Sequence, residues 1–90
     1  MSTITHAIRE VLNSKARLDV DSDSLHDDDD LYQHGLTSHA VVNVMLGVEE
    51  KFEVEFPDTL LRRGTFASVA SLRAAVVSCG VTDETDGAST

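Results

Sequence analysis

Ser38 is the residue of this chain with the clearest chemical potential, because its hydroxyl lies between Thr37 and His39 at the start of a helical pattern. Such a hydroxyl can cap the helix by accepting a hydrogen bond from a backbone N–H of the first turn. It can also project into solvent and accept a covalent group from another enzyme. A phosphate at this position would meet unpaired N–H groups and the positive end of the helix dipole. Because Thr37 could cap the helix instead, the position of Ser38 leaves both roles open.

Calcium binding is an alternative chemistry suggested by the aspartates before Ser38. Asp19, Asp21 and Asp23 match the first, third and fifth ligand positions of an EF-hand loop. Ser24 stands where that loop needs a glycine, and Asp30 stands where a bidentate glutamate is normal. We therefore expect a solvated acidic loop without a specific calcium site.

Zinc binding and hydrolysis are also disfavoured by the spacing of the histidines. His26, His34 and His39 do not supply the three or four convergent ligands of a dedicated zinc site. A hydrolytic serine needs a base within hydrogen-bond reach. Adjacent side chains on a helix point about 100° apart, so His39 is badly placed to activate Ser38. We therefore expect a protein that is not an enzyme.

The helical spacing of apolar residues predicts the elements that position Ser38. It predicts an all-α fold with four helices. The first three lie in the ranges 4–12, 38–52 and 57–62. The fourth begins after a cap at Thr65 or Ser68 and ends at Gly80. The acidic segment between the first two helices has no apolar period and is expected to be a long loop. The expected core residues are Ile8, Val11, Leu36, Val41, Met45, Val48, Phe52, Phe66, Val69 and Leu72.

The opposite face of the second helix mixes polar and apolar side chains, as a docking surface for a partner would. The candidate partner-binding residues are His39, Val42, Asn43, Leu46, Glu49, Glu50 and Glu53. The alternative is a wider core stripe that buries Val42 and Leu46. Gly47 costs a helix interior about 1 kcal/mol relative to alanine, so it is either simply tolerated or required by a closely packed neighbour.

Composition restricts the classes of partner and the location of the chain. Its 90 residues suit one domain, and a formal charge of −9 should repel nucleic acid and anionic membranes. Cys79 is the only cysteine, which excludes an internal disulfide. The sequence shows neither a signal-peptide pattern nor an apolar stretch long enough to span a membrane. We therefore expect a cytoplasmic protein, and a monomer.

The stretch "DDDDLYQHGLTSHAVVNVMLGVEEKFEVEFPD" resembles the acyl carrier protein family. It contains an acidic loop, a Gly-Leu turn, a serine at the start of a helix and a Phe-x-x-x-Phe-Pro connection. The resemblance implies an acyl-carrier-like four-helix bundle in residues 1–80. The acidic tail in residues 81–90 is expected to be disordered. It also implies that a phosphopantetheinyl transferase attaches a 4′-phosphopantetheine arm to Ser38. The arm would carry a thioester cargo to a downstream acyl or aminoacyl acceptor enzyme, and the second helix would be the main recognition helix.

Three departures from the usual motif separate this chain from carriers of fatty-acid synthesis. Thr37 and His39 replace the usual Asp and Leu beside the serine, and Asn43 stands where an acidic residue is common. The stretch "MLGVEEKFEVEFPDTLLRRGTFASV" is more similar to small bacterial aminoacyl carrier proteins. That likeness implies loading with a small amino acid by a ligase related to class II aminoacyl-tRNA synthetases. The remaining alternatives are an ordinary acyl carrier for fatty-acid, polyketide or nonribosomal peptide synthesis, and an unmodified acidic module that binds a basic partner.

The concentration of negative charge predicts how stability responds to ions. Salt or millimolar divalent cations should stabilise the fold, because they screen repulsion in the 19–30 segment and along the second helix. Urea unfolding with and without added salt measures the effect. Calorimetry should detect no discrete calcium stoichiometry, and a single tight calcium site would contradict our rejection of the EF-hand.

Overall fold

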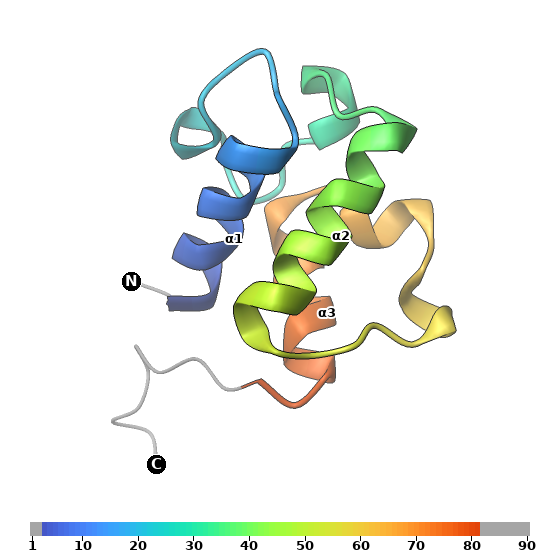
Figure 1. Ribbon diagram of the computed structural model, residues 1–90. Helices are drawn as coiled ribbons and strands as arrows, with labels where there is room; N and C mark the ends of the chain where they lie inside the picture. The colour runs from blue at the N-terminus through green and yellow to red at the C-terminus, as the bar shows by residue number, and fades with distance from the viewer. Residues whose placement is uncertain (1–2, 82–90) are drawn as a thin grey trace.

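The computed structural model describes residues 3–81, which form helices and turns and contain no β-strand (Figure 1). Its α-helices are α1 (Thr3–Lys15), α2 (Ser38–Phe52) and α3 (Val69–Ser78). Its 3₁₀ helices are η1 (Ser22–Ser24), η2 (Leu31–His34), η3 (Asp58–Leu60) and η4 (Arg63–Phe66). The prediction of an all-α protein is confirmed. Of the expected disordered tail, Val81 packs against the core and residues 82–90 lie outside the described range.

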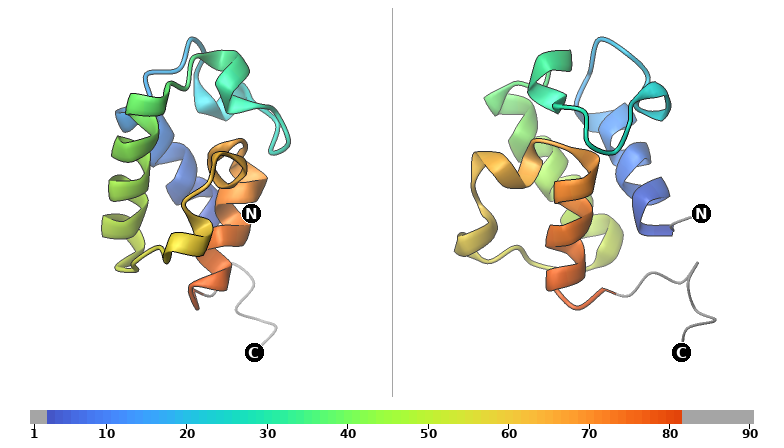
Figure 2. Two further views of the ribbon diagram at one scale, coloured as in Figure 1. Left: turned by 90° about the vertical axis from the view of Figure 1, so that its right-hand side faces the viewer. Right: turned by 180° about the vertical axis from the view of Figure 1, so that it is seen from behind.

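Helix α1 is the element against which both other α-helices pack. Its apolar residues recur every three or four positions, so they line one face and are all buried. Figures 1 and 2 show α2 beside α1, and the segment between α2 and α3 closing the side away from α1. The buried residues of α1 are Ile4, Ala7, Ile8, Val11 and Leu12.

The buried face of α2 is rotated by one residue from the predicted face. Ala40, Val44 and Val48 are buried, at a spacing of four. Of the four α2 residues expected in the core, only Val48 is fully buried, whereas Val41, Met45 and Phe52 are partly buried at its edge. Periodicity could not fix the rotation because apolar residues occupy most of the circumference of this helix.

Close packing at Gly47 helps to set the rotation of α2. A Cβ atom at Gly47 would lie 2.9 Å from Val11 Cγ1 and 3.3 Å from Lys15 Cγ on α1. Because real Cβ atoms essentially never approach another atom to 2.9 Å, a larger residue would force either the Val11 side chain or the packed helices to shift. Gly47 is therefore required by the contact between α1 and α2, as one of the two sequence interpretations held.

The predicted helix in residues 57–62 does not form, so the structure is not a four-helix bundle. After the single turn of η3, Leu61 and Arg62 leave the helical conformation, and Arg62 is extended with φ −135° and ψ 158°. This stretch has no apolar stripe to bury, and Leu61 is 46% exposed. Phe56 and Phe66 anchor the segment instead, because both rings are buried with centroids 6.1 Å apart.

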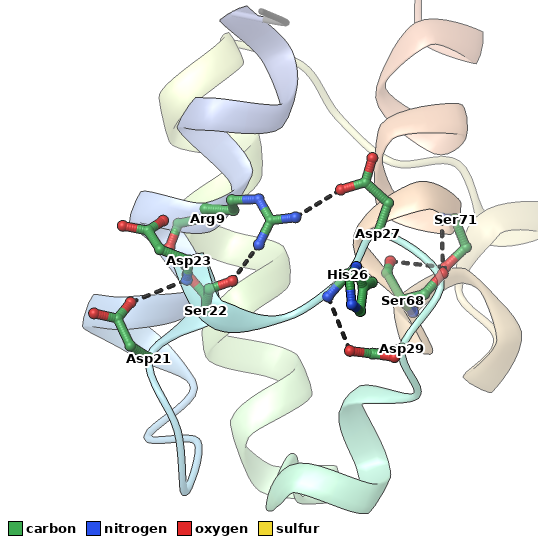
Figure 3. A network of polar contacts seen from close by, with 9 residues as sticks. All are labelled: Arg9, Asp21, Ser22, Asp23, His26, Asp27, Asp29, Ser68 and Ser71. Atoms are coloured by element: carbon green, nitrogen blue, oxygen red, sulfur yellow. Dashed lines mark hydrogen bonds and ion pairs between the residues drawn. The ribbon is translucent and has the colours of Figure 1, made fainter.

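The acidic segment between α1 and α2 is more ordered than the long loop that we expected. It contains η1 and η2, and the Arg9 guanidinium holds it to α1 (Figure 3). This guanidinium donates hydrogen bonds to the carbonyl of Ser22 and, at 2.6 Å, to Asp27 Oδ1. Ser22 is fully buried, and its hydroxyl donates to the Arg9 carbonyl at 3.0 Å while its N–H donates to Asn13 Oδ1 at 3.0 Å. Repulsion among the aspartates is thus opposed by a fixed cation on α1.

The end of the acidic segment is bonded to the start of α3. The carbonyl of Asp27 accepts a hydrogen bond from the Ala70 N–H at 2.9 Å, and the Leu31 N–H donates to the Ala67 carbonyl at 2.7 Å. Ser68 caps α3 in a capping box with Ser71. The segment that leads to Ser38 is therefore held from two sides.

The rotation of α2 predicts that alanine substitutions at Val42 and Val44 lower the free energy of unfolding by different amounts. Val44→Ala should lower the free energy of unfolding by about 2 kcal/mol, because it removes two buried methyl groups and leaves a cavity. Val42→Ala is the matched control and should change it by less than about 0.5 kcal/mol, because that side chain is exposed. Urea unfolding followed by circular dichroism compares the two variants. A larger cost at Val42 than at Val44 would contradict the observed rotation.

Candidate functional site

A fixed turn brings the chain to the start of α2. Helix η2 ends at Gly35, whose φ of 101° lies in the left-handed region that glycine adopts without strain. Leu36 follows with its side chain buried and its N–H bonded to the Leu31 carbonyl at 3.1 Å. The residues before the helix are therefore anchored, and Thr37 and Ser38 have defined positions.

Thr37, and not Ser38, caps helix α2. Thr37 is extended with φ −98° and ψ 163°, and its Oγ1 accepts a hydrogen bond from the Ala40 N–H at 3.0 Å. Its carbonyl accepts the next bond, from the Val41 N–H at 3.0 Å. Ser38 is the first helical residue and is exposed to solvent. Of the two roles that the sequence left open, capping is performed by Thr37, and the hydroxyl of Ser38 is accessible for modification.

Ser38 lies at an open depression of about 500 Å³ between α2 and the segment that follows it. The walls are largely apolar, and the floor residue Phe66 belongs to the core. The depression is lined by Tyr32, Ser38, Val41, Val42, Met45, Leu61, Arg62, Arg63 and Phe66. A group attached to Ser38 would therefore find an apolar surface directly beside it.

The apolar residues of the predicted docking surface are exposed, so the alternative of a wider core stripe is wrong. Val42 is 51% exposed and Leu46 is 52% exposed, one turn apart on α2. Around them the polar members of the predicted set that are exposed are His39, Asn43, Glu50 and Glu53. Large apolar side chains ringed by polar ones form the usual pattern of a contact site.

Glu49 differs from the other predicted partner-binding residues because its carboxylate has a bond within the fold. Its Oε2 accepts a hydrogen bond from the Phe56 N–H at 2.7 Å, and the residue is partly buried. Glu53 has a backbone role as the left-handed residue that ends α2, with φ 54°, while its side chain stays exposed. Of the three glutamates, Glu50 and Glu53 remain free to face a partner.

Tyr32 and Arg63 line the depression on the side opposite α2 and were not identified from the sequence. Arg63 lies with its guanidinium 3.7 Å from the centre of the Tyr32 ring, and the Tyr32 hydroxyl donates to the Arg63 carbonyl at 3.1 Å. Burial raises the pKa of the Tyr32 hydroxyl above its usual value, Arg63 opposes the rise and Asp30 adds to it. The hydroxyl is therefore protonated at neutral pH and can donate. No local sequence signal could have revealed this pair, because its members are far apart in the chain.

Two further properties of residues 3–81 bear on the site. No group of three or more His, Cys, Asp or Glu side chains in this range is arranged to hold a metal ion. No helix in the same range is long and apolar enough to cross a membrane. His34 and His39 do not come together, since His34 Nδ1 faces Asp19 Oδ1 at 3.4 Å and His39 is exposed on α2.

Comparisons with known proteins agree with this geometry. The chain is 48% identical over 65 residues to an aminoacyl carrier protein of Agrobacterium fabrum. The matched residues make up 72% of this chain and 78% of that protein. A carrier protein from Agrobacterium tumefaciens, crystallised with ATP and an engineered Bradyrhizobium japonicum glycine:[carrier protein] ligase, matches with a TM-score of 0.80 and 43% identity. That match covers 82% of this chain and 96% of the other.

A solution structure of an Agrobacterium tumefaciens protein matches more of the chain, with a TM-score of 0.66, 40% identity and coverage of 94% of this chain and 96% of that one. Residues 3–73 match the family described as "Phosphopantetheine attachment site". The resemblance inferred from the sequence is therefore confirmed, and the chain belongs to the phosphopantetheine-binding family of carrier proteins.

Proposed function

We propose that this protein is an aminoacyl carrier that holds an amino acid as a thioester on a 4′-phosphopantetheine arm attached to Ser38. The observation that carries the proposal is the exposure of Ser38 beside a threonine that already caps the helix. The match to the phosphopantetheine attachment family supports the presence of the arm. The relative named an aminoacyl carrier protein supports an amino acid as cargo. Because the reactive thiol belongs to the arm, the protein itself carries the cargo and does not catalyse its transfer.

The start of α2 is suited to a phosphodiester on Ser38. The first-turn N–H groups of a helix and its dipole favour negative charge by about 0.3 to 1 kcal/mol at an exposed site. Thr37 uses only the Ala40 N–H for its side-chain cap. The N–H groups of Ser38 and His39 are available to the phosphate oxygens, because the first N–H groups of a helix have no partner within it.

A ligase of the kind bound to the structural neighbour is the proposed loading partner. That neighbour is a carrier protein complexed with a glycine:[carrier protein] ligase. In this chain, Val42 and Leu46 supply apolar contact area on α2, with Asn43 between them on the exposed side. We expect the ligase to bury both apolar side chains, and Glu50 and Glu53 to steer the encounter from the rim. A phosphopantetheinyl transferase and a downstream acceptor are the other partners that such a carrier needs.

Paired substitutions at the start of α2 test the separation of the cap from the attachment site. Ser38→Ala should abolish the mass increase produced by a phosphopantetheinyl transferase with coenzyme A, while changing stability by less than about 0.5 kcal/mol. Thr37→Ala is the control: it should keep the mass increase but lose about 1 kcal/mol of stability with the cap. Intact-mass spectrometry and urea unfolding provide the two readouts. Addition of the arm to the Ser38→Ala protein would refute the assignment of Ser38.

Loading by the ligase tests the docking surface. Val42→Asp or Leu46→Asp should slow loading of the modified carrier by at least about tenfold, because a charged group would replace a desolvated apolar anchor. Glu53→Gln should slow it by no more than about threefold, because it alters a charge at the rim. Thioester formation is followed by mass spectrometry on variants whose folding has been verified by circular dichroism. Loading that depends on Glu53 but not on Val42 or Leu46 would show that the apolar pair lies outside the interface.

A further inference from the structure

Arg62 and Arg63 are unusual in a chain with such a large excess of acidic residues. The protein has 7 Lys and Arg against 16 Asp and Glu, and both arginines are exposed. Within residues 3–81, the ion pairs use other cationic groups, from His6, Arg9, His34 and Lys51. Two adjacent guanidinium groups thus remain without a carboxylate partner in the described part of the chain.

The fold holds these cations at the depression that contains Ser38. Arg62 and Arg63 line it together with Ser38, although they lie more than 20 residues later in the chain. The Tyr32 ring fixes Arg63, because the guanidinium stacks over it at 3.7 Å and the hydroxyl bonds to the backbone of the same residue. Arg62 is extended at the start of η4. Arg63 is thus held in place, and Arg62 precedes it directly in the chain.

We propose that Arg62 and Arg63 bind the phosphodiester of the arm on Ser38 and that the pantetheine chain lies along the apolar wall formed by Val41, Val42 and Met45. This inference rests on the proposed function, because it requires an arm at Ser38. Guanidinium groups bind phosphate oxygens through paired N–H donors, and the arm brings the anion that the two arginines lack. In the resting carrier the arm then lies on the protein surface, and the small cargo at its end stays near solvent.

Three properties favour the arm over a separate partner as the occupant. The phosphate is covalently tethered at the wall of the depression, so its effective concentration near the arginines is high. The volume of about 500 Å³ lies within the range of about 300 to 1,000 Å³ that is usual for small-molecule sites. The lining combines apolar side chains with two arginines, which matches a chain that has an anionic group at one end and branched methyl groups beside it.

Nuclear magnetic resonance of the unmodified and modified chains tests the proposal. On addition of the arm, the backbone amides of residues 61–63 and the arginine Nε–H groups should shift, as well as the amides near Ser38. Nuclear Overhauser contacts should join the methyl groups of the arm to Val42 or Met45. In the Arg62→Gln/Arg63→Gln protein, the shift at Leu61 should fall by at least about twofold, because the charge-assisted bonds are lost.

Two further variants make the result interpretable. Lys51→Gln removes the same charge at the other end of α2, about 20 Å along the helix from Ser38, and should leave the arm contacts unchanged. Arg62→Gln alone preserves the stack of Arg63 on Tyr32 and should reduce the shifts even if the double variant fails to fold.

The possible failures can be told apart by mass spectrometry and by ligase loading. If no arm is added, the proposed function fails and this inference fails with it. If the arm is present but the shifts are confined to residues 37–41, only the inference is overturned. If the arginine variants slow ligase loading while the arm contacts persist unchanged, the arginines bind the ligase and the inference is likewise overturned.

Discussion

The hydrogen bond from the Ala40 N–H to Thr37 Oγ1 decides which hydroxyl at the start of α2 is available for chemistry. A serine one residue earlier would be occupied as the cap, and a serine one residue later would lie on another side of the helix. With Thr37 in this role, Ser38 takes the first helical position and is exposed to solvent. The accessibility of Ser38 thus depends on the neighbouring threonine as much as on the serine itself.

The segment before α2 carries seven of the 16 Asp and Glu residues of the protein, and it must still hold the start of α2 in place. Arg9 opposes the repulsion by bonding both Ser22 and Asp27, and the backbone of Asp27 is bonded to the first turn of α3. Gly35 then reverses the chain in the left-handed conformation, and buried Leu36 anchors it. The position of Ser38 is therefore determined by contacts with α1 and α3 as well as by its own helix.

The sequence was sufficient to predict the helices whose positions follow from the local spacing of apolar and capping residues. The apolar period in residues 4–12 located α1 and its buried residues Ile8 and Val11, and the succession of Thr37, Ser38 and a long apolar pattern located the start of α2. The same reasoning failed where several solutions are locally equivalent. Apolar residues lie on most sides of α2, so its rotation depended on the packing of Gly47 against Val11.

The remaining differences arise from tertiary contacts that leave no local signal. Residues 57–62 have helix-compatible composition but no stripe to bury, so they form one 3₁₀ turn and an extended link instead of a fourth helix. The stack of Arg63 on Tyr32 joins residues 31 positions apart, and no periodicity could reveal it. The exposure of Val42 and Leu46 likewise follows from the observed rotation of α2. The exposed serine at the start of α2 was therefore predictable from the sequence, and most of the depression beside it was not.

If the cargo of this carrier is an amino acid, the mass of the modified protein should reveal it after incubation with ATP, glycine or alanine and a synthetase-like ligase. We expect the added mass of the amino acid, its release by hydroxylamine as for a thioester, and poor transfer of a malonyl group to the same protein. Efficient malonyl transfer without aminoacyl loading would contradict the account and identify an ordinary acyl carrier.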